Sequence, residues 1–113
     1  MENLMLKFQG FHPSEFTRTY LNDKMMHLQD EAPFGATVQA SFSRQNKFFK
    51  GIITINSNAG KFFAMASGTK LKDVTHKLNE QMRKQLERWK SRRHHRESIK
   101  NIEYDYDDVH SLA

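Results

Sequence analysis

The chain has 113 residues, 37% of them hydrophobic and 12% aromatic, which predicts a single globular domain with one core. It contains no cysteine, which excludes a disulfide framework, a thiol nucleophile and a cysteine-based metal site and fits a reducing cytosol. The net charge is +5, and neither an apolar run of roughly 18–20 residues nor a signal-peptide pattern is present, so we predict a cytoplasmic protein without a membrane partner.

The front of the chain predicts a strand followed by a helix. Apolar and polar residues alternate over residues 4–10, as in a half-buried strand. Ser14 is a candidate N-cap, and Glu15 lies where the helix dipole favours an anion. One apolar helical face then recurs at three- and four-residue steps, at Thr17, Tyr20, Leu21, Met25 and Leu28. We therefore expect a helix over about 14–31, ended by Pro33 and Gly35.

Three strands are predicted next, over residues 36–43, 48–56 and 61–67. They are rich in β-branched and aromatic residues, and residues 44–47 and 57–60 between them have turn chemistry. Such short connections indicate an antiparallel meander. Phe63 and Met65 alternate with Phe62, Ala64 and Ala66, so one of these two sets faces the core and the other the uncovered side of the sheet.

The second helix is the strongest signal in the sequence. Thr69 is its expected cap, and apolar residues follow at steps of 3, 4, 4, 4 and 3, at Leu71, Val74, Leu78, Met82, Leu86 and Trp89. This predicts a helix from about 70 to at least 90. The periodicity fades after Arg96, so we expect a domain over residues 1–96 and an acidic, flexible tail over residues 97–113.

The predicted order of elements is therefore β-α-β-β-β-α. The economical packing of these elements is an α+β fold, in which a four-stranded sheet carries both helices on one face. The other face of the sheet would be open to solvent or to a partner.

Charge is distributed unevenly along the chain. Residues 1–60 hold six basic and five acidic groups, whereas residues 61–100 hold twelve basic and four acidic groups. Residues 101–113 hold four acidic groups and no basic one. A basic surface of this density attracts a polyanion, and nucleic acid is the commonest polyanion in a cytosol.

The second helix displays this charge around its apolar stripe. An acidic ridge of Asp73, Glu80 and Glu87 lies between two basic rows, and the pairs Asp73–Lys77 and Glu80–Lys84 are expected to support the helix. Towards the end of the helix the cations outnumber the carboxylates, which favours a surface for RNA phosphates over a merely solvated face. The candidate RNA-binding residues here are Lys70, Lys77, Arg83, Lys84, Arg88, Lys90, Arg92 and Arg93.

Other kinds of site have little support. His94 and His95 are adjacent and point in different directions on a helix, and no HxxxH spacing exists, so we expect no metal. No nucleophile elbow, phosphate-cradling glycine loop or paired-carboxylate motif is present, so we expect neither an enzyme nor a cofactor or small-molecule substrate. Trp89 lies on the apolar stripe, which favours core packing over base stacking.

The chain resembles the ribosome hibernation factors, the family of hibernation-promoting factor and ribosome-associated inhibitor A. The resemblance covers about residues 4–93. In the first helix it rests on Ser14, Arg18, Tyr20, Lys24 and Leu28. Later it rests on Ala64, Ala66 and Gly68 and on the run Met82-Arg83-Lys84-Gln85-Leu86. The sequence departs from the family pattern at Lys70-Leu71-Lys72 and Val74-Thr75, and at His27, where a basic residue is common.

The resemblance implies a short-form, non-enzymatic translation inhibitor. Such a protein would bind the 30S subunit or the 70S ribosome through 16S rRNA and block the mRNA and tRNA channel in stationary phase or stress. By position, the resemblance adds Lys24 to the RNA-binding set and includes Lys84, Arg88 and Arg92. Two alternatives stay open: a free double-stranded RNA-binding domain, and a protein-interaction module that uses the open face of the sheet.

Overall fold

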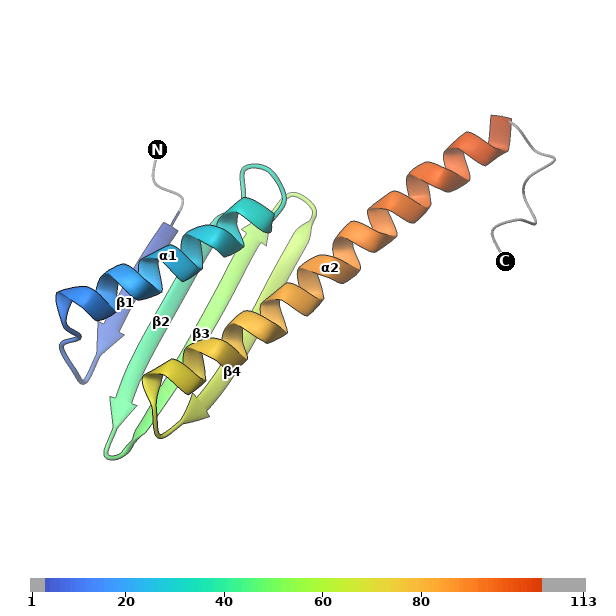
Figure 1. Cartoon of the computed structure of the whole chain (residues 1–113). Helices are drawn as coiled ribbons and strands as arrows, with labels where there is room; N and C mark the ends of the chain where they lie inside the picture. The colour runs from blue at the N-terminus through green and yellow to red at the C-terminus, as the bar shows by residue number, and fades with distance from the viewer. Residues whose placement is uncertain (1–3, 105–113) are drawn as a thin grey trace.

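The computed structural model of the chain describes the backbone of residues 4–104 and the side chains of residues 4–92. The predicted order β-α-β-β-β-α is confirmed. The elements are β1 (Leu4–Gln9), α1 (Glu15–Glu31), β2 (Thr37–Gln45), β3 (Phe48–Ser57), β4 (Gly60–Gly68) and α2 (Leu71–Tyr104). Figure 1 shows both helices on the same face of one sheet, with α2 extending well beyond the sheet.

The four strands lie side by side in chain order, β1-β2-β3-β4. β2, β3 and β4 form the predicted antiparallel meander, whereas β1 is parallel to β2 because α1 carries the chain back to the starting edge. The fold is thus α+β with a mixed sheet. α1 packs over β1 and β2, and α2 packs over β3 and β4.

The first helix begins and ends where its sequence predicts. Ser14 is the N-cap, and its hydroxyl accepts a hydrogen bond from the backbone N–H of Thr17 at 3.1 Å. The helix buries Leu21, Met25 and Leu28 against the sheet. It ends at Glu31, and the predicted breakers Pro33 and Gly35 follow in the connection to β2.

The core lies between the sheet and the two helices. Four members of the α2 stripe are buried, namely Val74, Leu78, Met82 and Leu86, whereas Leu71 and Trp89 pack against the core from its margin. The α2 helix approaches β3 closely at Gly51, where an added Cβ would lie 2.6 Å from Cδ1 of Leu78. The absence of a Cβ at Gly51 therefore allows α2 to pack close to the sheet at this point.

The side-chain alternation of β4 assigns its two faces. Phe62 and Ala64 are buried in the core, whereas Phe63 and Met65 lie on the uncovered face with 50% and 47% of their surface exposed. The two alternating sets therefore face opposite sides, as the sequence predicts.

The second helix continues past the end of its periodic pattern, to Tyr104. A helix needs no core contact to keep its own backbone hydrogen bonds, and residues 97–104 contain neither glycine nor proline. The first part of the segment expected to be a flexible tail is thus helical. Residues 105–113 lie outside the described residues, and the division of the chain at residue 96 stays a prediction.

Candidate nucleic-acid interface

The position of α2 at the edge of the sheet is fixed by two glutamine side chains. Gln81 accepts from the N–H of Met65 at 3.2 Å and donates to its carbonyl at 3.0 Å. Gln85 does the same at Phe63, with distances of 3.1 Å and 2.5 Å. Because β4 is an edge strand, these backbone groups have no neighbouring strand to pair with. The two amides take the place of that strand.

The spacing of these contacts follows from helix and strand geometry. Four residues of a helix rise about 6.0 Å, and two residues of a strand span about 6.6 Å, so side chains at i and i+4 of α2 meet alternate residues of β4. Lys77, four residues before Gln81, extends the series by donating to the carbonyl of Ser67 at 3.2 Å. We call Lys77, Gln81 and Gln85 the edge ladder.

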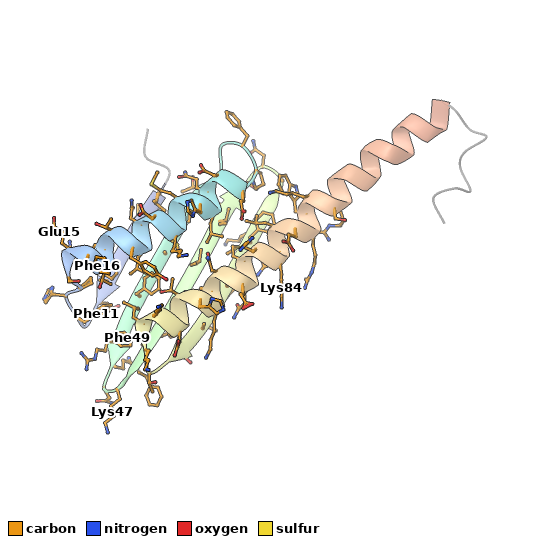
Figure 2. All side chains as sticks on the ribbon, in the orientation of Figure 1. Phe11, Glu15, Phe16, Lys47, Phe49 and Lys84 are labelled. Carbon is orange, nitrogen blue, oxygen red and sulfur yellow. The ribbon has the colours of Figure 1, made fainter. Side chains whose placement is uncertain are left out.

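Beyond the edge ladder, four cations surround one hollow of about 450 Å³. Lys61 comes from β4, and Lys84, Arg88 and Arg92 come from successive turns of α2. Figure 2 shows Lys84 projecting from α2 on the side away from α1. We call this hollow, with its four cations, the basic hollow. Its remaining lining comes from Phe62 and from the amides of Gln81 and Gln85.

The cations of the basic hollow lack carboxylate partners within the described part of the chain. The ion pairs found there join His76 to Glu80 at 3.1 Å and Arg83 to Glu31 at 3.9 Å. The expected pairs Asp73–Lys77 and Glu80–Lys84 are therefore wrong, since Lys77 bonds to β4 and Glu80 faces His76. Lys84 is left free to meet an anion.

The other predicted residues are distributed around the two helices. Arg83 faces α1 through its ion pair with Glu31, and Lys24 lies half-buried with its ammonium 5.5 Å from the ring centre of Tyr20. Lys70 and Lys90 are exposed and line neither the basic hollow nor the hollow between the helices at Phe16 and Tyr20. The side chain of Arg93 lies outside the described residues, as do those of His94 and His95.

The structure thus brings together Lys84, Arg88 and Arg92 and separates Lys24 and Arg83 from them. The sequence did not identify Lys61 as a candidate RNA-binding residue. Its only local signal is that it follows a turn and begins a strand, and nothing in that pattern places it beside α2. Trp89 is confirmed as a packing residue, since its ring meets Phe62 edge-on with the ring centroids 6.4 Å apart.

The described residues show neither a membrane-spanning helix nor a metal-type cluster. No helix among them is long and apolar enough to cross a membrane. Within the same residues, no group of three or more His, Asp or Glu side chains could hold a metal ion.

Comparison with solved structures identifies others with the same fold. The N-terminal domain of Thermus thermophilus Protein Y is similar with a TM-score of 0.68 and 15% sequence identity, covering 79% of this chain and 99% of that domain. A ribosomal subunit interface protein from Coxiella burnetii is similar with a TM-score of 0.67 and 15% identity, covering 78% of this chain and 97% of that one. No protein-family model and no curated protein matches the sequence. At this identity, the likeness establishes the fold.

Proposed function

We propose that this protein is a ribosome-binding translation inhibitor that holds 16S rRNA through the basic hollow. One observation carries the proposal: Lys61, Lys84, Arg88 and Arg92 converge on one hollow without a carboxylate partner in the described part of the chain. Uncompensated cations held side by side repel one another, and a phosphate backbone relieves that repulsion. A similar fold occurs in a protein named for the ribosomal subunit interface, which supports a ribosomal polyanion as the partner.

The mechanism follows from what such contacts can and cannot do. Contacts to phosphates position a protein on RNA but carry no base sequence, so the shape of the ribosome has to supply the selectivity. The body of the domain would then occupy the channel of the 30S subunit that mRNA and tRNA use, in free subunits or in 70S ribosomes. Translation would stop by occlusion, without a chemical step, in the cytoplasm during stationary phase or stress.

Co-sedimentation with purified 30S and 70S particles, with and without duplex RNA as competitor, tests the proposal. We expect saturable 30S binding that an excess of duplex RNA does not remove. Binding that duplex RNA removes completely would instead identify a double-stranded RNA-binding domain. Absence of binding to both would overturn the RNA-binding role of the basic hollow.

A charge-reversal variant connects the binding to the hollow. Lys84→Glu with Arg88→Glu should weaken ribosome binding at least tenfold and reduce the log–log salt slope by about 1.4–1.8, at about 0.7–0.9 per phosphate contact. Lys47→Glu with Lys72→Glu makes the same change of net charge at exposed sites outside the hollow. Equal losses in the two variants would show that net charge, and not the basic hollow, determines the binding.

A further inference from the structure

We propose that the uncovered face of the sheet is a second binding surface, which takes an unpaired segment of RNA by stacking bases on Phe63 and Met65. This goes beyond the proposed function, because the face lies on the opposite side of the sheet from the helices and can bind independently of the basic hollow. The surface consists of the outward side chains of β1–β4, and we call it the open sheet face.

Exposed apolar side chains lie on both edge strands of the open sheet face, β1 and β4. The strand register aligns Phe63 with Thr54, Gln39 and Met5 across the sheet, and it aligns Met65 with Ile52 in the next row. Phe63, Met65 and Met5 are 50%, 47% and 48% exposed. The ring of Phe63 presents a flat π surface on which a base can stack, and the thioethers of Met5 and Met65 add polarisable contacts.

Phe48 adds a second aromatic ring on the same face. It is 59% exposed and belongs to the outward set of β3, because the alternate residues Gly51, Ile53 and Ile55 are buried. The row that contains Phe63 crosses β3 at Thr54, six residues from Phe48, so the two rings lie about 20 Å apart along the sheet. Two rings at this separation fit an extended strand of several nucleotides, not a single base.

The charge of the face selects a polyanion over a protein. None of the four strands contains Asp or Glu, whereas Lys7 and Lys50 point to the open side. The core of a typical protein–protein interface is depleted of charged residues, and its apolar side chains are contiguous. Here polar Thr54 and Gln39 separate Phe63 from Met5 in the register, whereas Met65 pairs with Ile52. A nucleic-acid strand needs this mixture, with phosphates on the lysines and bases on the rings.

A hollow of about 220 Å³ lies over β1, β2 and β3 and includes the residues of β1–β3 that are aligned with Phe63. Its lining combines polar groups with apolar walls and includes Met5, Lys7, Gln39, Ser41, Ile52 and Thr54. Amide and hydroxyl groups can donate to and accept from the edge of an unstacked base, which is how single-stranded RNA is read. The hollow therefore supplies hydrogen bonding next to the stacking surface.

The edge ladder holds the backbone of the stacking residues in place. Both backbone groups of Phe63 and both of Met65 are bonded to α2, through Gln85 and Gln81. Phe63 and Met65 thus belong to a strand, β4, whose outer edge is hydrogen-bonded to α2. A preorganised platform loses little conformational freedom when a base stacks on it.

Methionine methyl NMR tests the proposal on the intact chain, with single-stranded 12-mers of oligouridine and oligoadenosine as probes. We expect the methyl signals of Met5 and Met65 to shift on titration. Met26 is the matched control, because it is 47% exposed but lies on α1. Equal shifts at Met26, or no shift at Met5 and Met65, would overturn the proposal.

Substitution of the ring gives a second, independent result. Phe63→Ala should weaken oligonucleotide binding about tenfold, as expected for the loss of one base–aromatic stack. Phe34→Ala removes a fully exposed ring from the α1–β2 connection and should change nothing. Equal affinities of the two variants would refute stacking on Phe63. A Phe63→Ala protein that binds RNA normally but loses self-association in sedimentation would identify the face as a protein interface instead.

The binding roles proposed for the open sheet face and for the basic hollow can be disproved separately. The Lys84→Glu, Arg88→Glu variant should keep the Met5 and Met65 shifts even where ribosome capture is lost. Loss of these shifts together with capture would show that the oligonucleotides occupy the basic hollow and not the sheet. Circular dichroism of each variant confirms that it is folded.

Discussion

The side-chain amide of Gln85 makes two hydrogen bonds to the backbone of Phe63, accepting from its N–H and donating to its carbonyl. One residue of α2 therefore pairs with one residue of β4 as a neighbouring strand would. This contact ties the helix that carries Lys84 and Arg88 to the strand that carries Lys61 and Phe63. The basic hollow and the open sheet face are thus built on one rigid junction.

Removal of the Gln85 amide should loosen this junction. Gln85→Ala is expected to lower the free energy of unfolding by about 1–3 kcal/mol, because two solvent-accessible hydrogen bonds are lost at about 0.5–1.5 kcal/mol each. Urea denaturation measures the change. Gln45→Ala removes an exposed glutamine at the end of β2 and should have little effect. If both variants are equally stable, the edge ladder contributes nothing to the fold.

Removal of both glutamine amides of the edge ladder should also expose the edge of β4 to other chains. An edge strand with free N–H and C=O groups is a template for strand pairing, so Gln81→Ala with Gln85→Ala should increase self-association at high concentration. Sedimentation velocity detects this. A double variant that stays in the oligomeric state of the parent chain would contradict a protective role for the two amides.

Lys61 is expected to be an RNA-binding residue, although the sequence did not identify it. Lys61→Glu should weaken ribosome binding severalfold and lower the salt slope by about 0.7–0.9, the value for one phosphate contact. The matched change is Lys47→Glu, at the exposed turn between β2 and β3. An unchanged salt slope in Lys61→Glu would remove Lys61 from the basic hollow's function.

The close approach of α2 to the sheet depends on Gly51. A Cβ at this position would lie 2.6 Å from Leu78 and 3.0 Å from both Phe42 and Val74, so Gly51→Ala should cost about 1–3 kcal/mol of stability through overpacking. Thermal and urea denaturation measure it. Gly68→Ala is the control, since its Cβ would meet its nearest neighbour at an ordinary 3.5 Å. Equal tolerance of the two alanines would argue against tight packing at Gly51.

The N-cap of α1 offers a local test of stability. Ser14→Ala removes the acceptor for the Thr17 N–H and should lower the free energy of unfolding by about 1 kcal/mol. Thr19→Ala, at an exposed position inside the same helix, should be neutral or slightly stabilising because alanine has the higher helix propensity. In urea denaturation, Ser14→Ala should therefore be clearly less stable than Thr19→Ala, and equal stabilities would contradict the cap.

Much of the fold was predictable because burial repeats with the period of each element. The three- and four-residue steps from Leu71 to Trp89 predict both the existence of α2 and the side that faces the sheet. The alternation around Phe63 likewise separates the two faces of β4. The excess of cations on α2 is visible in the sequence itself. The end of α2 was harder, because its last turns extend beyond the sheet, where burial leaves no pattern.

The sequence by itself determined the elements, their buried faces and the basic helix, because these depend on residues that are close along the chain. Tertiary structure alone decided which cations lie together. Local spacing pairs Lys77 with Asp73, but the carbonyl of Ser67 at the edge of β4 takes Lys77 instead. Lys61 joins Arg88 across a gap of more than twenty residues, since β4 is the edge strand beneath α2. Such pairings depend on how strands and helices are ordered in space, and no sequence period encodes that order.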